Sequence, residues 1–333
     1  MTLYNVETGS NLILLCSAIL FPIIYIIMRL IPQYFSSFFG ECVANNKTSK
    51  FHLPMVRGLG IIFPIVLILS SVLLGSLLSD IEIIIITIST FIGFWDDKYG
   101  LRQKHKLVFF IFLGFIWSFS QINSTNMDIS FFINLIFYNF TFVFFVLLFN
   151  QIDGINGLAT STFLVCILFI YITGVNLILL MPLIITLVAY LMINMSGKVG
   201  IQGDSGSFFI GSLAAVMLTK TIELERSGII LFTLGPIIFD VCATTMVRIY
   251  NKVDLSIGHR NNLYQKLVSR YQSHFMVTFI FFITQILFCI FLIYLLEIIS
   301  LMNFYFILFL IGTIFMSLFC ILAHLIHENR ILK

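Results

Sequence analysis

Long apolar segments separated by short polar stretches follow one another along the whole chain. Runs of roughly 18 or more apolar residues with few charges are typical of helices that cross a membrane. The pattern therefore predicts an all-α polytopic membrane protein with about eleven transmembrane helices. The predicted spans are Leu12–Ile31, Gly60–Leu78, Ile81–Trp95, Leu107–Ser120, Phe131–Phe149, Leu158–Thr173, Val175–Ile193, Phe208–Thr219, Gly228–Arg248, Phe275–Ile298 and Asn303–Ile326.

The third, fourth and eighth of these spans are short for a full crossing. Either they tilt against their neighbours, or the helices continue into polar residues outside the apolar runs. Composition predicts one membrane domain over residues 1–333, because 60% of the residues are hydrophobic, 10% are charged and no break in composition marks a linker. A soluble chain carries about 25% charged residues, so we exclude a soluble protein and expect no nucleic-acid partner.

The lysines and arginines predict the orientation of the chain in the membrane. With the N-terminus outside, 16 of the 18 lie in inner loops, at inner span ends or in the C-terminal tail, and only Lys220 and Arg226 lie outside. Positive residues gather on the cytoplasmic side, so the C-terminus is expected to be cytoplasmic. Acidic residues count little in this rule, yet the same assignment places three acidic stretches on the inner face.

These three stretches lie where apolar segments end, at Trp95–Gly100, Asn150–Gly157 and Gly203–Ser207. A bare carboxylate in hydrocarbon is costly, so water or a ligand has to meet these residues. We interpret them as loops that meet on one side of the membrane and hold a metal and a diphosphate.

Asp96 and Asp97 form a pair of adjacent carboxylates. Neighbours on a helix point about 100° apart, so we expect different roles for the two. One would bind magnesium or orient a nucleotide, and the other would face the attacking group. The alternative is a solvated helix end whose acids face the nearby cations Lys98, Arg102, Lys104 and Lys106.

Asn150, Asp153 and Asn156 are spaced by three, so they would share one face of a helical turn. Carboxylate and amide oxygens are hard ligands that suit magnesium. The alternative is a helix C-terminus with turn-forming glycines at Gly154 and Gly157.

The stretch Gly203–Ser207 opens an apolar helix, where Ser205 or Ser207 would cap the N-terminus and the free N–H groups would bind an anion. Asp204 beside this site would carry magnesium onto a diphosphate. Simple capping is the alternative.

Two cationic stretches complete the inner face. In the loop His259–Gln265, His259 would donate to a phosphate or sugar, and Arg260 would supply a fixed cation for phosphate. A basic segment lying on anionic lipid is the alternative. Arg57 adds another cation before the second span. Asp240 lies inside a predicted span, where a functional site and a structural hydrogen bond remain equally open.

Together these motifs resemble those of the polyprenyl-phosphate N-acetylhexosamine-1-phosphate transferases, a bacterial membrane family also called glycosyltransferase family 4. That family has an Asp-Asp pair after an early span, an Asn-x-x-Asp-Gly-x-Asp/Asn-Gly-Leu-Ala stretch, a Gly-Asp-x-Gly-Ser stretch and a His-containing loop. Here these read Asp96-Asp97, Asn150–Ala159, Gly203–Ser207 and His259–Gln265, in the same order and over nearly the whole chain.

The chain departs from the family pattern at three positions. Val56 and Leu59 replace a proline and a glycine before the second span. The loop from His259 is similar to the His-Arg-x-His-x-Tyr-Gln form of enzymes that start O-antigen or capsule chains, but Asn262 replaces its second histidine. The His-His-His run of the muramoyl-pentapeptide branch is absent. The resemblance therefore favours the O-antigen and capsule branch.

The resemblance implies a reaction at the cytoplasmic face of the bacterial inner (plasma) membrane. A polyprenyl phosphate, such as undecaprenyl phosphate, attacks a UDP-N-acetylhexosamine, UMP leaves, and a cell-surface polysaccharide or lipopolysaccharide begins. Mg²⁺ would assist, with Mn²⁺ as an alternative. The resemblance implies catalytic roles for Asp96, Asp97 and Asp153, metal binding by Asp204, Asp97 and Asp153, and substrate contacts from Asn150, Asn156, His259, Arg260, Arg57 and Ser205.

The rival class is an ion-coupled secondary transporter with a polar site at the inner face. Transporters hold their acids near the middle of the bilayer on broken helices, whereas only Asp240 lies well inside a predicted span here. The identity of the sugar and the oligomeric state stay open, a homodimer being one alternative.

Overall fold

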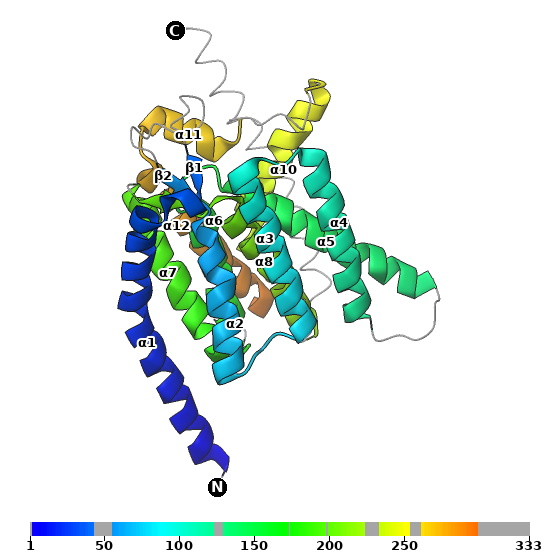
Figure 1. The fold of residues 1–333 in the computed structure, drawn as a ribbon. Coiled ribbons are helices and arrows are strands. Elements are labelled where there is room, and N and C mark those ends of the chain that lie inside the picture. Colours follow the sequence, from blue (N-terminus) through cyan, green and yellow to red (C-terminus); the bar gives the residue numbers. More distant parts are fainter. Residues whose placement is uncertain are drawn as a thin grey trace.

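The computed structural model of the chain describes residues 2–42, 55–122, 129–172, 174–197, 199–223, 233–253 and 261–298. Helices make up most of this part (Figure 1). The α-helices are α1 (Thr2–Tyr34), α2 (Ile62–Leu74), α3 (Asp80–Tyr99), α4 (Gln103–Gln121), α5 (Ile129–Ile152), α6 (Leu158–Ile172), α7 (Met181–Ser196), α8 (Gly203–Glu223), α10 (Gly235–Tyr250), α11 (Leu263–Tyr271) and α12 (His274–Ile298). Short 3-10 helices are η1 (Ser36–Phe38), η2 (Leu59–Ile61) and η3 (Ile178–Leu180), and the strands are β1 (Gly40–Cys42), β2 (Met55–Arg57) and β3 (Gly200–Ile201).

The three short predicted spans correspond to full-length helices that continue into polar residues. Helices α3, α4 and α8 have 20, 19 and 21 residues. A capping box starts α3, because Ser79 N–H donates to Glu82 Oε2 at 2.8 Å and the Ser79 hydroxyl accepts from Glu82 N–H. Gly100 ends it with φ of +72°. Asp96 and Asp97 therefore belong to the last turn of α3, and the expectation of a separate acidic loop is corrected.

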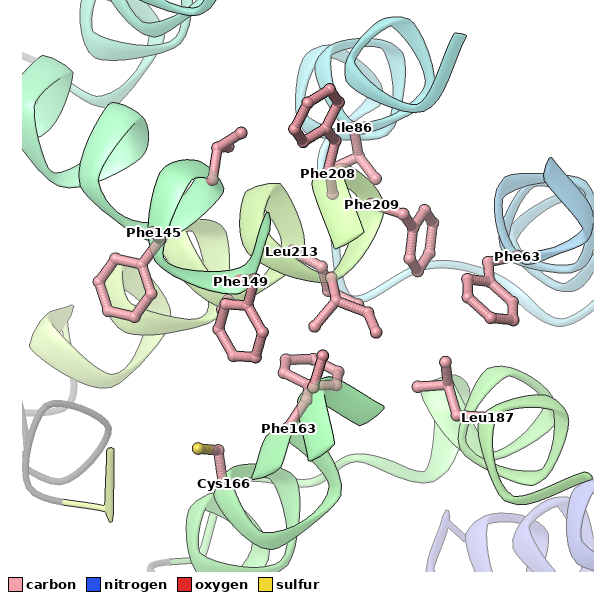
Figure 2. Packing of buried hydrophobic residues seen from close by; sticks show 14 of the residues in the cluster. Phe63, Ile86, Phe145, Phe149, Phe163, Cys166, Leu187, Phe208, Phe209 and Leu213 are labelled. Atoms are coloured by element: carbon pink, nitrogen blue, oxygen red, sulfur yellow. The ribbon is translucent and has the colours of Figure 1, made fainter. Parts of the chain in front are cut away.

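Helix α8 is the centre of the bundle. Every residue from 203 to 219 is buried, and α8 contacts α3, α5, α6 and α2. In Figure 2, Phe63 on α2, Phe149 on α5, Phe163 on α6 and Leu187 on α7 surround side chains of α8 such as Leu213. Because α8 is enclosed on all sides, its N-terminus is held firmly against the ends of its neighbours.

The outer faces of the peripheral helices are apolar, as expected for a chain surrounded by lipid. Leu15, Phe112, Ile136 and Leu287 are examples of large side chains that are largely exposed. Within the described residues, four helices are long and apolar enough to cross a membrane, at Ile13–Pro32, Ile129–Ile152, Ile178–Ser196 and His274–Phe291. The prediction of an all-α membrane protein is confirmed in this coarse form. The count of eleven spans stays a prediction, and the predicted span Asn303–Ile326 lies outside the described residues.

Two features were not expected from the sequence. Helix α11 begins at Leu263, inside the stretch His259–Gln265 that we predicted to be a loop. A small three-stranded sheet, in the order β1-β2-β3, has β1 antiparallel and β3 parallel to β2. The sheet pairs Arg57 with Ile201, and Gly60 N–H donates to Gln202 O at 3.1 Å. In Figure 1 the strands and α11 lie at the end of the bundle opposite the start of α1.

Candidate active site

Three carboxylates and two cations meet where α3, α4, α8 and β2 come together. We call Asp96, Asp97, Asp204, Arg57 and Lys106 the charged cluster. Arg57 Nε lies 2.7 Å from Asp97 Oδ1, and its terminal nitrogen lies 2.5 Å from Asp204 Oδ1. Lys106 Nζ lies 2.7 Å from Asp96 Oδ2 and 3.0 Å from Asp204 Oδ2. Asp204 thus lies between both cations. The first and third acidic stretches, at the end of α3 and the start of α8, lie together as predicted.

Asp97 is bound to the N-terminus of α8 through both carboxylate oxygens. Oδ1 accepts the N–H of Asp204 at 2.7 Å, and Oδ2 accepts the N–H of Ser205 at 3.0 Å. Gly203 has φ of +70°, and a Cβ there would lie 2.3 Å from Asp97 Oδ2. The free N–H groups that we expected to bind an anion are therefore occupied by an anion of the protein itself.

Asp96 points to other partners, as the 100° step between neighbours requires. Its Oδ1 accepts the N–H of Leu101, and its Oδ2 pairs with Lys106. The alternative prediction, in which the acids face the cations that follow them, is thus seen for Asp96 and Lys106. That pair is buried rather than solvated, because both side chains are 7% exposed.

Asp153 lies in the turn after α5 and joins the cluster through Gln202. Gln202 Nε2 donates to Asp153 Oδ1 at 2.8 Å, while its own oxygen accepts from Thr160. The Gln202 N–H donates to the Tyr190 hydroxyl at 2.7 Å. Burial raises the pKa of Asp153 well above its ordinary value, and the charge of Asp204 adds to this increase.

Asp204 behaves in the opposite way. Burial disfavours its charged form, but the neighbouring Asp96 and the cations Arg57 and Lys106 lower its pKa below the ordinary value. Asp204 therefore keeps its charge more easily than an ordinary aspartate, whereas the nearby Asp153 takes up a proton more easily.

The three residues of the second acidic stretch do not share a face. Asn150, within α5, donates to the Ser207 hydroxyl at 3.2 Å, which brings it to the start of α8. Asn156 instead donates to Asn194 O at 3.1 Å, and its own carbonyl accepts from Thr278. The helix ends at Ile152, so the three-residue spacing no longer describes a helical face. The expectation that Asn156 joins Asp153 is corrected.

The remaining predicted residues divide into two groups. Ser205 is fully buried, and its hydroxyl donates to Gln202 O at 2.8 Å, so it contributes to the local structure at the start of α8 rather than capping it. His259 and Arg260 lie outside the described residues, and their predicted contacts stay predictions.

Sequence reasoning missed Lys106, Gln202 and Tyr190 as members of the site. Lys106 was among four cations after α3, and its position directly before the apolar run from Leu107 is the signal that separates it from them. Gln202 precedes the Gly-Asp stretch directly. No local pattern marks Tyr190, which reaches Gln202 from α7.

The donor set fits a magnesium ion in kind. Among the described residues, no group of three His, Cys, Asp or Glu side chains is arranged to hold a metal. Arg57 and Lys106 pair with Asp96, Asp97 and Asp204 instead. Magnesium, however, is usually held by one or two carboxylates together with phosphate and water. Asp153 fits that role, since Gln202 is the described donor to only one of its oxygens. Asp204 would fit it when a bound phosphate takes over Arg57 and Lys106, which pair with its two oxygens in this structure.

Comparisons with known proteins agree on one family. Residues 81–222 match glycosyl transferase family 4. Over 313 residues the chain is 27% identical to a Bacillus subtilis (strain 168) protein named "Probable undecaprenyl-phosphate N-acetylglucosaminyl 1-phosphate transferase", and the alignment covers 86% of this chain and 85% of that protein. The matched segment includes Asp96, Asp97, Asp153 and Asp204. Both comparisons support the family predicted from the motifs, and the O-antigen or capsule branch stays a prediction.

Proposed function

We infer the activity of this chain from the premise that it belongs to glycosyl transferase family 4. It transfers an N-acetylhexosamine-1-phosphate from a UDP-sugar to undecaprenyl phosphate. An oxygen of the lipid phosphate forms a bond to the sugar-proximal phosphorus, the bond between the two phosphates of the donor breaks, and UMP leaves with the electron pair. The relative's name points to UDP-N-acetylglucosamine as the first donor to try.

The charged cluster is the observation that supports this chemistry. Phosphoryl transfer depends on positioning and on neutralising charge more than on covalent assistance. Arg57 and Lys106 supply two fixed cations beside Asp204. When the phosphates of the substrates enter, Arg57 and Lys106 would bind them in addition to the aspartates of the charged cluster.

We assign roles to the acids according to their surroundings. Asp204 and Asp153 would hold magnesium, which polarises the diphosphate when bound. Asp96 would orient the lipid phosphate, since it lies at the end of α3 beside Lys106. Asp97 holds the start of α8 and would support the site from there. Asn150, next to Ser207, would contact the nucleotide.

The orientation of the chain forms part of the proposal. The N-terminus lies outside, and the charged cluster lies at the cytoplasmic face of the inner (plasma) membrane, where UDP-sugars are available. Sixteen of the 18 lysines and arginines then lie inside. In the transporter alternative the acids would lie near mid-membrane, and the positions of Asp96, Asp97 and Asp204 at helix ends give it no support.

The experiment measures UMP released by purified protein in detergent with undecaprenyl phosphate, a panel of UDP-N-acetylhexosamines and magnesium. Asp204→Asn should remove the activity, and EDTA should do the same. Asp80→Asn is the matched control, because Asp80 is exposed at the opposite end of α3 from Asp96. Release that needs lipid, metal and Asp204 supports the proposal. A folded wild-type protein that releases no UMP from any donor contradicts it.

A further inference from the structure

Asp240 on α10 caps a helix to which it does not belong. Its Oδ1 accepts the N–H of Leu263 at 2.8 Å, and its Oδ2 accepts the N–H of Tyr264 at 3.3 Å. These are the first two residues of α11. The carboxylate is buried, with the residue 1% exposed, and a charge in that position is stabilised by helix N–H groups.

The residue at the usual capping position has a different role. Asn262 is the N-cap residue of α11, but its side chain makes no capping hydrogen bond. It donates instead to the hydroxyl of Tyr264 at 2.8 Å. Asn is one of the best capping residues. Here Asp240 accepts the N–H groups at the start of α11, so the Asn262 side chain is available to bind the hydroxyl of Tyr264.

Tyr264 carries this arrangement to the candidate active site. Its hydroxyl donates to Gln151 O at 2.5 Å, and the whole residue is buried with its ring packed edge-on against Phe281. Helix α11 also touches Gly154, where a Cβ would lie 2.8 Å from Gln265 Nε2 and 3.4 Å from the Tyr264 hydroxyl. Helix α11 thus contacts the turn on both sides of Asp153.

We propose that Asp240 and Tyr264 are positioning residues that hold the turn Gln151–Gly154, and with it the carboxylate of Asp153, in its place beside Gln202. Asp240 fixes the start of α11, α11 presents the Tyr264 hydroxyl, and the hydroxyl fixes the backbone two residues before Asp153. The effect on catalysis rests on the proposed function, whereas the mechanical link between α10 and the turn does not.

Two variants remove single parts of this link without removing bulk. Asp240→Asn keeps the shape but loses the charge and one acceptor, so an amide N–H₂ faces the N–H of Leu263 or Tyr264. Tyr264→Phe removes only the hydroxyl that Gln151 and Asn262 use. The matched controls are Thr245→Val on α10 and Tyr271→Phe at the exposed end of α11. The described hydrogen bond of the Thr245 hydroxyl goes to Val241 O, within its own helix.

The first readout is hydrogen–deuterium exchange of the purified protein in detergent without substrate. We expect both variants to raise exchange in residues 150–157 and 263–271, with peptides of α1 and α7 unchanged, and both controls to match wild type. A variant that merely weakens the fold would raise exchange throughout. Unchanged exchange in residues 150–157 in both variants overturns the proposal.

The second readout is the rate of UMP release per folded molecule. A small misplacement of a catalytic group costs up to about a hundredfold, so we expect each variant to lower kcat about ten- to a hundredfold with a smaller change in KM for the UDP-sugar. The double variant should lose no more than the worse single variant, because both act through one path. If the kcat of the double variant falls by the product of the two single losses, the proposal is overturned. If the wild type releases no UMP, the proposed function fails, and the exchange experiment still decides the link.

Discussion

Asp97 on α3 accepts the backbone N–H of Asp204, the second residue of α8, at 2.7 Å. This bond joins two acidic motifs that lie 107 residues apart in the chain. One carboxylate thereby fixes the backbone that carries another. Arg57 binds both, at 2.7 Å and 2.5 Å, so the two negative charges are held close together without leaving either unpaired.

The first prediction concerns the stability supplied by Asp97. Asp97→Ala removes the acceptor of two buried N–H groups at the start of α8, and loss of a helix cap costs about 1–2 kcal/mol. We expect a clearly lower midpoint of thermal unfolding in detergent. Asp80→Asn, an exposed acid in the first turn of α3, should change the midpoint little. Equal midpoints for Asp97→Ala and wild type would show that the cap contributes nothing.

The main helices were accessible from the sequence because hydrocarbon imposes a minimum apolar length on each one. Acids at the ends of apolar runs were a second accessible signal, since carboxylates avoid lipid. These two signals located Asp96, Asp97, Asp153 and Asp204. The predicted helix boundaries were wrong where a polar helix end is covered by protein, as at the last turn of α3 and the first turn of α8.

Three other features could not be read from local pattern. Strands of two or three residues, such as β3, carry too little periodicity to be seen. The prediction from the spacing of Asn150, Asp153 and Asn156 assumed a helix over all three residues. The helix ends at Ile152, and a turn with Gly154 and Gly157 follows. The capping of α11 by Asp240 depends on a contact across 23 residues, which only the tertiary fold provides.

The second prediction concerns Lys106, which bridges Asp96 and Asp204. Lys106→Met leaves two buried carboxylates facing each other without their shared cation, and breaking such a pair costs about 3 kcal/mol or more. We expect UMP release to fall about a hundredfold or more. Lys104→Met is the matched control, because Lys104 is exposed on the same helix. Equal rates for the two variants would exclude a role of Lys106 in the reaction.

The third prediction separates Asn150 from Asn156. Asn156→Ala loses the hydrogen bond to Asn194 O, so it should cost about 1 kcal/mol of stability and leave the KM for the UDP-sugar within about twofold of wild type. Asn150→Ala loses its bond to Ser207 at the start of α8 and should raise that KM. The two KM values, with thermal midpoints, check this. A KM raised by Asn156→Ala alone would restore the sequence-based expectation.

The last prediction concerns magnesium and does not depend on turnover. A ligand that binds only the folded state at a hundredfold excess over its Kd stabilises it by about 2.7 kcal/mol. Because magnesium completes its shell with phosphate, we expect Mg²⁺ with UDP to raise the thermal midpoint of the wild type more than either alone. Asp204→Asn should lose this gain, whereas Asp80→Asn should keep it. An equal gain in Asp204→Asn would place the ion elsewhere, and Asp153→Asn would then be the next variant to measure, since it is the other carboxylate whose donor set suits the ion.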